Sequence, residues 1–206
     1  MSAPAWERTL AVRTADETHA LAAVLGARLR AGDLLVLTGE LGAGKTTFTQ
    51  GLGEGLGVRA GIISPTFVLV RIHPNLPDGP RPGGPDLVHV DAYRLGSASE
   101  IDDIDLENTM DSAVTVVEWG RGRVEHLSES RLEVDLVRSL GGAAAAPGAL
   151  ETATLAPGTL DFDTEDDDEP RTIVIRGFGP RWVDPPFLPK PSGTVPTPTP
   201  HTPEGH

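Results

Sequence analysis

The chain has 206 residues, 38% of them hydrophobic and 23% charged, which is ordinary for a globular protein and fits one domain with extra segments. It contains no cysteine and carries a net charge of −13. Disulfides and thiolate metal sites are therefore excluded, and direct binding of DNA or RNA is not expected, because that affinity depends largely on basic residues that neutralise phosphates. A role with nucleic acid would have to run through a partner.

Membrane insertion and secretion are also not expected. No apolar run approaches the roughly 18 residues that span a bilayer, and the first residues lack the basic and then apolar pattern of a secretory leader. We therefore expect a cytoplasmic protein that does not contact a membrane.

The first elements are read from hydrophobic spacing. Leucines at helical spacing predict a helix over 15–30, with Thr14 or Asp16 as its cap. The short apolar run at 34–37 predicts a strand that is buried on both faces. A glycine-rich turn and a second helix start follow, but glycine stands at every other position from 51 to 57. Each such glycine costs about 1 kcal/mol against alanine, so this helix is expected to be short, frayed or ended by one of them.

The sequence after residue 61 predicts one interrupted strand, a loop, a helix and four further strands. Residues 62–72 resemble a strand that Pro65 interrupts, and 74–86 are rich enough in proline and glycine to predict an exposed loop. The acidic segment 100–106 has the spacing of an amphipathic helix. Short apolar or alternating runs predict four more strands, at 87–90, 114–117, 132–137 and 172–175.

Composition divides the chain into four parts. Residues 1–138 form the predicted core, and 139–169 are first rich in glycine and alanine and then acidic, with seven acidic residues in 161–169. We expect 139–169 to be a disordered insertion, 170–184 to return as a core strand that pairs with 132–137, and the proline-rich 185–206 to be a disordered tail. The expected fold is one α/β domain.

The strongest motif is a phosphate-binding loop. It fits G-x-x-x-x-G-K-[ST] and directly follows the strand at 34–37, which is the context that the motif requires. Its residues are Gly39, Glu40, Leu41, Gly42, Ala43, Gly44, Lys45 and Thr46, with Thr47 next. Backbone N–H groups and a helix N-terminus would face the phosphates, Lys45 would reach the β- and γ-phosphates, and Thr46 would offer a hydroxyl to Mg²⁺. The alternative is a chance glycine-rich turn.

Two acidic residues end predicted strands. Asp91 and Glu118 follow apolar runs, and in α/β sheets ligands bind beyond the carboxyl ends of strands. One or both can therefore face a nucleotide and its metal, although a strand-end acid can also point to solvent. His89 alternates with Asp91 on its strand and is either functional or a hydrogen-bonded structural histidine. Trp119 is more typical of packing than of chemistry.

Ser64-Pro65-Thr66 is a candidate switch segment. Two hydroxyls flank a proline that fixes the backbone, and they could contact a γ-phosphate or the attacking water as switch segments do in other nucleotide hydrolases. An ordinary Ser-Pro turn is the alternative reading.

The order of these motifs resembles the TsaE (YjeE) family of bacterial ATPases needed to make N6-threonylcarbamoyladenosine in tRNA. The resemblance rests on the phosphate loop, Ser-Pro-Thr-Phe at 64–67, His-Val-Asp-Ala-Tyr-Arg-Leu at 89–95, and Glu-Trp at 118–119, in that order. It implies a three-layer P-loop NTPase fold, with a mostly parallel sheet and antiparallel edge strands, and a slow, Mg²⁺-dependent ATPase. It also implies partnership with TsaB and TsaD, whose complex modifies adenosine 37 of tRNAs reading codons that begin with A. Contact with tRNA would be indirect.

The resemblance implies roles for individual residues. Lys45 and the loop amides would hold ATP, and Thr46 and Glu118 would be Mg²⁺ ligands. Asp91 would be the catalytic or water-orienting acid, and Thr66 the γ-phosphate sensor. Residues on the nucleotide or partner face would be Tyr93, Arg94 and Trp119, and positions bordering the adenine would be Thr18 and Arg171.

Two other functions share the same loop. A small-molecule P-loop kinase would need an acceptor pocket and usually an arginine-bearing lid, whereas residues 100–111 carry six acids and no basic residue. A non-catalytic module gated by nucleotide would bind ATP without turnover.

Overall fold

The structure is a computed structural model that describes residues 3–95, 100–101, 105–138, 170–186 and 188. Its elements, in chain order, are β1 (Trp6–Val12), α1 (Ala15–Gly26), β2 (Leu34–Thr38), α2 (Lys45–Leu56), β3 (Val70–His73), β4 (Asp86–Asp91), α4 (Glu107–Met110), β5 (Ala113–Glu118), β6 (Arg131–Arg138), β7 (Arg171–Phe178) and the 3₁₀ turn Pro180–Trp182.

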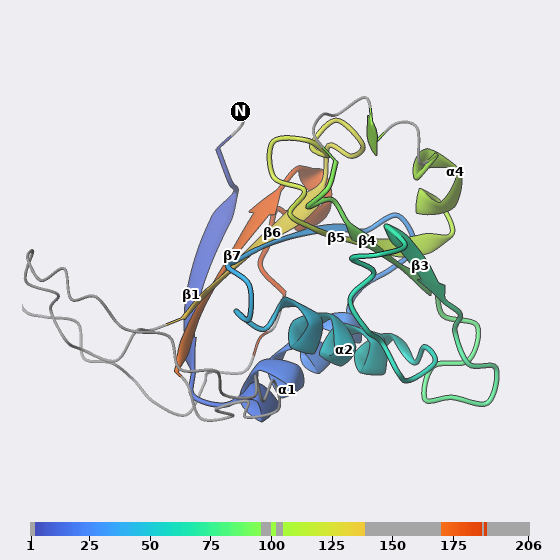
Figure 1. The fold of residues 1–206 in the computed structure, drawn as a ribbon, viewed down its shortest axis with the longest axis horizontal. Coiled ribbons are helices and arrows are strands. Elements are labelled where there is room, and N and C mark those ends of the chain that lie inside the picture. Colours follow the sequence, from blue (N-terminus) through green and yellow to red (C-terminus); the bar gives the residue numbers. More distant parts are fainter. Residues whose placement is uncertain (1–2, 96–99, 102–104, 139–169, 187, 189–206) are drawn as a thin grey trace, which may run out of the picture.

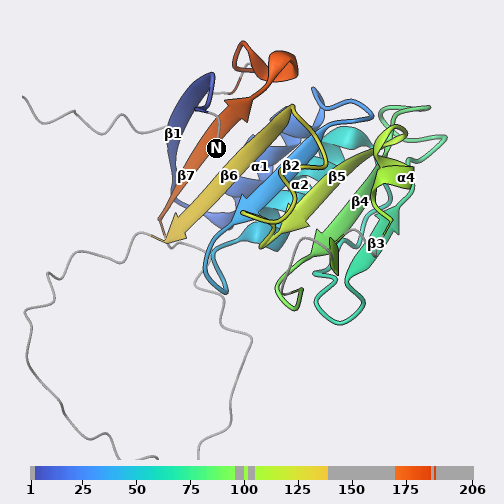
Figure 2. The ribbon, with the colours of Figure 1, turned by 90° about the horizontal axis from the view of Figure 1, so that it is seen from above.

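The strands form one seven-stranded sheet in the order β1-β7-β6-β2-β5-β4-β3 (Figure 2). Its centre is parallel, since β2 pairs in parallel with β5 and β6, and β5 with β4. The edges are antiparallel, through β3 on β4 and through β7 between β6 and β1. The expected α/β P-loop fold, with a mostly parallel sheet and antiparallel edge strands, is confirmed.

Helices and loops cover both faces of the sheet and make three layers. Figure 1 shows α1 and α2 on one face and α4 on the other. The buried strand β2 contributes to the core on both sides: Leu35 and Leu37 pack with α1 and α2, whereas Leu34 and Val36 belong to the cluster on the α4 side. This two-sided burial is what the continuous apolar run predicted.

Two of the glycines of α2 are explained by the contact of this helix with α1. A Cβ at Gly51 would lie 2.2 Å from the carbonyl oxygen of His19, and one at Gly55 would lie 2.1 Å from that of Ala23. The helix therefore continues past these glycines to Leu56 and ends at Gly57, which adopts the left-handed conformation with φ 73°. Of the expected outcomes, the helix ended by a glycine is confirmed.

We expect Gly55→Ala to lower the free energy of unfolding by about 1–3 kcal/mol, the usual cost of forcing extra atoms into a packed contact. The matched control is Gly53→Ala on the same helix, where the new Cβ would meet the flexible end of Ile62 at 2.3 Å rather than backbone. Both variants gain the same helix propensity, about 1 kcal/mol. Urea denaturation would measure the difference, and equal stabilities would contradict the backbone contact.

Several element boundaries differ from the sequence prediction. The first helix ends at Gly26 rather than at residue 30. Only the end of 62–72 is a strand, since β3 begins at Val70 and the stretch around Pro65 forms turns. The strand β1 was not predicted, because Leu10 and Val12 are its only buried residues and the three consecutive polar residues before them, 7–9, are all exposed.

Other predictions are confirmed or fall outside the structure. The hairpin between β6 and β7 is confirmed, with Leu136 opposite Ile173. Of the helix predicted at 100–106, residues 100 and 101 are helical and 105–106 form a turn, whereas 102–104 lie outside the described residues. So do the insertion 139–169 and nearly all of the tail. Among the described residues, no helix is long and apolar enough to cross a membrane.

Candidate functional site

The glycine-rich loop connects β2 to α2, and two of its glycines adopt backbone angles that other residues rarely adopt. Gly42 and Gly44 have φ of 76° and 94°, values that side chains with a Cβ rarely adopt. Gly39 is needed for a different reason, since a Cβ there would lie 2.6 Å from the carbonyl oxygen of Leu136. The loop ends at Lys45, the first residue of α2, so the positive end of that helix and its free N–H groups face the loop.

The Lys45 side chain lies folded over this loop. Its ammonium donates to the carbonyl oxygens of Gly39 at 2.8 Å and Glu40 at 2.9 Å, and lies 4.2 Å from the ring centroid of Trp119. Burial lowers the pKa of Lys45, while the nearby carboxylates of Glu118 and Asp91 act to raise it. The lysine is thus a buried cation next to two acids.

Asp91 and Glu118, the two acids at strand ends, lie at the same edge of the sheet. In the β4–β5 register Asp91 stands opposite Glu118, and the two residues are only 4% and 3% exposed. Neither points away into solvent, as the alternative reading required. Because β2, β4 and β5 are parallel neighbours, their carboxyl ends meet at one edge of the sheet, and this edge carries the glycine-rich loop.

The Ser64–Thr66 segment holds the Asp91 carboxylate. Thr66 donates its hydroxyl to Oδ2 of Asp91 at 2.7 Å, and the Ser64 and Thr66 hydroxyls are 2.7 Å apart. The other oxygen, Oδ1, accepts the backbone N–H of Tyr93 at 2.9 Å. The orientation of this carboxylate is therefore set from two sides.

Glu118 and the residue after it are held in a similar way. A ring nitrogen of His89, Nε2, lies 2.8 Å from Oε1 of Glu118. Trp119 has a left-handed backbone with φ 62°, and its ring meets Tyr93 edge to face, with centroids 5.4 Å apart. This unusual backbone turns the Trp119 ring over Lys45, so Trp119 lines the site rather than only packing behind it.

These parts enclose a cavity of about 420 Å³. Its lining consists of Ala15, Leu41, Gly42, Gly44, Lys45, Thr46, Thr47, Ser64, Thr66, Asp91, Glu118, Trp119, Arg138 and Arg171. The structure thus brings together the loop, both acids, the Thr66 hydroxyl and Arg171. Gly39 and Glu40 contribute the carbonyls that hold Lys45, and Ala43 is a buried residue of the loop.

Thr18 is the predicted site residue that the structure places elsewhere. It is fully buried in α1, and its hydroxyl donates to the carbonyl oxygen of Thr14 at 3.2 Å. Ala15, almost one turn earlier, lines the cavity instead. Helical geometry accounts for the change of residue, because positions three apart differ by about 60° around the axis.

Arg138 is a lining residue that the sequence reasoning missed. It stands opposite Arg171 in the β6–β7 register. A Cβ on Gly42 would come within 3.3 Å of Nη1 of Arg138, and one on Gly44 within 3.5 Å of Nε of Arg171. The two arginines therefore flank the loop. The available signal was a basic residue on each side of the segment that connects the two predicted strands of the hairpin.

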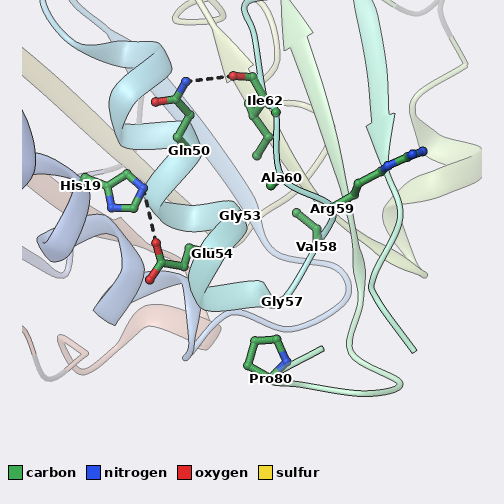
Figure 3. Close-up of a pocket in the computed structure, with 11 residues that line it drawn as sticks. His19, Gln50, Gly53, Glu54, Gly57, Val58, Arg59, Ala60, Ile62 and Pro80 are labelled. Atoms are coloured by element: carbon green, nitrogen blue, oxygen red, sulfur yellow. Dashed lines mark hydrogen bonds and ion pairs between the residues drawn. The ribbon is translucent and has the colours of Figure 1, made fainter. Parts of the chain in front are cut away.

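Another cavity, of about 360 Å³, lies beside the C-terminal half of α2 (Figure 3). It shares no lining residue with the first. Gln50 donates to the carbonyl oxygen of Ile62 at 2.9 Å, and Nε2 of His19 lies 3.5 Å from Oε2 of Glu54. None of the predicted site residues lines it.

The oxygen donors at the loop fit a hard cation. Thr46 offers a hydroxyl and Glu118 a carboxylate, and both line the cavity; Mg²⁺ prefers such ligands and usually completes its shell with water and substrate phosphates. Within the described ranges, no group of three or more His, Cys, Asp or Glu side chains could hold a metal alone. A magnesium ion here would therefore need the nucleotide as well.

A comparison with known families assigns the chain. The family model described as threonylcarbamoyl adenosine biosynthesis protein TsaE matches residues 12–142, a range that includes every cavity residue except Arg171. The chain belongs to the TsaE family. TsaE proteins take part in the biosynthesis of threonylcarbamoyladenosine in tRNA.

Individual relatives agree with this assignment. A TsaE protein of Streptomyces coelicolor is 48% identical over 156 residues, covering 75% of this chain and 86% of that protein. A TsaE of Bacillus subtilis is 40% identical and covers 60% of this chain and 73% of the relative. The crystal structure of Bacillus subtilis YdiB superposes with a TM-score of 0.57 at 27% identity, covering 86% of this chain and 89% of YdiB.

Proposed function

We propose that this TsaE protein is a Mg²⁺-dependent cytoplasmic ATPase that works with the TsaB–TsaD complex to form N6-threonylcarbamoyladenosine at position 37 of tRNAs reading codons that begin with A. One observation supports this most: Lys45 and Thr46 share a single cavity with Asp91 and Glu118. Phosphate binding, metal binding and a positioned acid are the three parts that nucleotide hydrolysis needs.

The loop would bind the triphosphate. Gly42 and Gly44 turn the backbone so that N–H groups point at phosphate oxygens, and the N-terminus of α2 adds its partial positive charge. Lys45 would exchange its two carbonyl acceptors, on Gly39 and Glu40, for β- and γ-phosphate oxygens. Arg138 and Arg171 flank the loop and add positive charge on the β6–β7 side.

Thr46 and Glu118 would hold the magnesium ion. When bound, the ion would neutralise charge on the β- and γ-phosphates. The chain supplies one hydroxyl and one buried carboxylate from two different elements, so this pair orients the phosphates relative to the β4 and β5 strand ends.

Asp91 would orient the water that attacks the γ-phosphorus, while the bond to the β-phosphate oxygen breaks to leave ADP and phosphate. Tyr93 N–H and the Thr66 hydroxyl occupy one lone pair on each carboxylate oxygen, which leaves further lone pairs to accept a proton of water. Thr66 lines the same cavity and would report the presence of a γ-phosphate through this same hydrogen bond. Catalysis would come from positioning and charge neutralisation, without a covalent step.

The charge of the protein supports indirect contact with tRNA. With a net charge of −13, the chain has little to offer a polyanion, so TsaB and TsaD would hold the tRNA. ATP turnover would then act on the conformation of that complex.

An ATPase assay tests the proposal. Phosphate release from ATP would be measured with Mg²⁺ or EDTA, without any acceptor, and then with the TsaB–TsaD complex added. We expect slow, Mg²⁺-dependent release by the protein alone and a changed rate with the complex. Strict dependence on a small-molecule acceptor would instead support the kinase alternative, and ATP binding without release in every mixture would support the non-catalytic module.

A further inference from the structure

His89 makes the contact that holds the Glu118 carboxylate. It lies on β4, two residues before Asp91, and its side chain is completely buried. Its Nε2 is 2.8 Å from Oε1 of Glu118. Within the described part of the chain, this is the only side-chain hydrogen bond to that carboxylate.

The carboxylate of Glu118 fixes the direction of its hydrogen bond with His89. Nδ1 of His89 is buried and has no hydrogen-bond partner among the described residues. An ionised carboxylate oxygen can only accept a hydrogen bond, so the ring nitrogen that lies 2.8 Å from Oε1 has to carry the proton. The ring proton therefore belongs on Nε2, which donates to Oε1 of Glu118.

The hydrogen bond from His89 makes the two oxygens of the Glu118 carboxylate different. Oε1 faces the buried imidazole behind the strand ends, while Glu118 also lines the cavity beside Lys45 and Thr46. Oε1 has one lone pair taken by the imidazole, whereas Oε2 accepts no side-chain hydrogen bond from the described residues, so Oε2 is the less engaged oxygen for a ligand in the cavity. A buried carboxylate with no such donor would have to desolvate both oxygens and could turn about its side-chain bonds.

We propose that His89 is a positioning residue for the magnesium site, which acts by holding Glu118 with one oxygen presented to the metal. This inference rests on the proposed function, in which Glu118 is a metal ligand. Groups that hold a metal ligand in this way typically change metal affinity by about 10–100-fold when they are removed. His89 itself touches neither nucleotide nor metal.

Metal binding rather than turnover tests the proposal. Mn²⁺ replaces Mg²⁺ as a paramagnetic probe, and its dissociation constant is measured by electron paramagnetic resonance with the full chain and saturating ADP. We expect His89→Leu to weaken Mn²⁺ binding by about 10–100-fold, with the affinity for ADP in EDTA unchanged. His89→Gln should restore most of the Mn²⁺ affinity, because its amide nitrogen can take the place of Nε2.

Two matched variants make the result decisive. His73→Leu removes a second buried imidazole, whose ring centroid is 6.4 Å from that of His89 and whose Nε2 has no hydrogen-bond partner among the described residues; it should leave Mn²⁺ affinity unchanged. If His89→Leu does not fold, His89→Asn replaces it, because the shorter amide cannot reach Glu118 and should bind Mn²⁺ less tightly than His89→Gln.

The outcomes distinguish the positioning role of His89 from the role of Glu118 as a metal ligand. Wild-type Mn²⁺ affinity in the folded His89→Leu or His89→Asn variant, or equal losses in these variants and His89→Gln, would overturn the role of His89. Glu118→Gln should itself lose Mn²⁺ binding. If Glu118→Gln binds Mn²⁺ as the wild type does, Glu118 is not the metal ligand, and the magnesium site of the proposed function falls together with the role of His89.

Discussion

Replacing Lys45 with alanine is expected to reduce ATP hydrolysis by at least about 10²–10³-fold, the usual effect of removing one preorganised group that stabilises charge in the transition state. The reason is electrostatic. Lys45 is the cation that lies between the loop and the carboxylates of Asp91 and Glu118. Without it, the negative phosphates would approach two buried acids with nothing between them.

The test of Lys45→Ala measures ATP binding as well as ATP hydrolysis, and it includes a control variant. ATP affinity would be measured by calorimetry and turnover by phosphate release, and we expect ATP binding to weaken as well. Arg59→Ala removes a cation next to the other cavity and should change neither quantity. Undiminished hydrolysis by a folded Lys45→Ala protein would show that the loop is not the site of ATP turnover.

Asp91→Asn is expected to lower turnover by about 10²–10⁴-fold, the range for a positioned acid or base, while ATP binding is retained. The amide has nearly the shape of the carboxylate and can still accept the N–H of Tyr93, but it cannot carry the negative charge that orients and polarises a water. None of the hydrogen bonds of Asp91 reaches the glycine-rich loop that is proposed to hold the phosphates, so binding should survive. The same two assays measure both effects.

A control on the same strand makes the Asp91 result interpretable. Asp86 begins β4 at the opposite end from the cavity and accepts the backbone N–H of Asn75, so Asp86→Asn should leave turnover unchanged. Normal turnover by Asp91→Asn would remove Asp91 from the mechanism. If ATP binding and turnover disappeared together, Asp91 would be a binding residue rather than the group that orients water.

The parts of the site that could be predicted from sequence are those that depend only on residues close together in the chain. The glycines at 39, 42 and 44, with Lys45 and Thr46, follow a buried strand within a few residues, and their roles depend on backbone angles and on the start of one helix. Asp91 and Glu118 could be proposed because strand-end acids in a parallel sheet meet at one edge. Their registration opposite each other, however, depends on β4 and β5 being neighbours.

Other site residues depend on contacts between distant segments. Arg138 joins the cavity only because β6 lies beside β2 and pairs with β7. His89 could be read as structural or functional until its ring was found 2.8 Å from Glu118, 29 residues away. Thr18 and Ala15 differ only in which side of α1 they occupy, and the packing of that helix on α2 decides it.

The amino-acid sequence by itself determined the glycine-rich loop between a buried strand and a helix, the two acids at strand ends and the α/β class, because these depend on short-range backbone geometry and on hydrophobic spacing. Only the tertiary structure decided why α2 tolerates Gly51 and Gly55, where β1 pairs, and which oxygen of Glu118 is held by His89. The physical reason is the same in each case. Close packing and buried hydrogen bonds join atoms that are far apart in the chain, and local propensities carry no information about them.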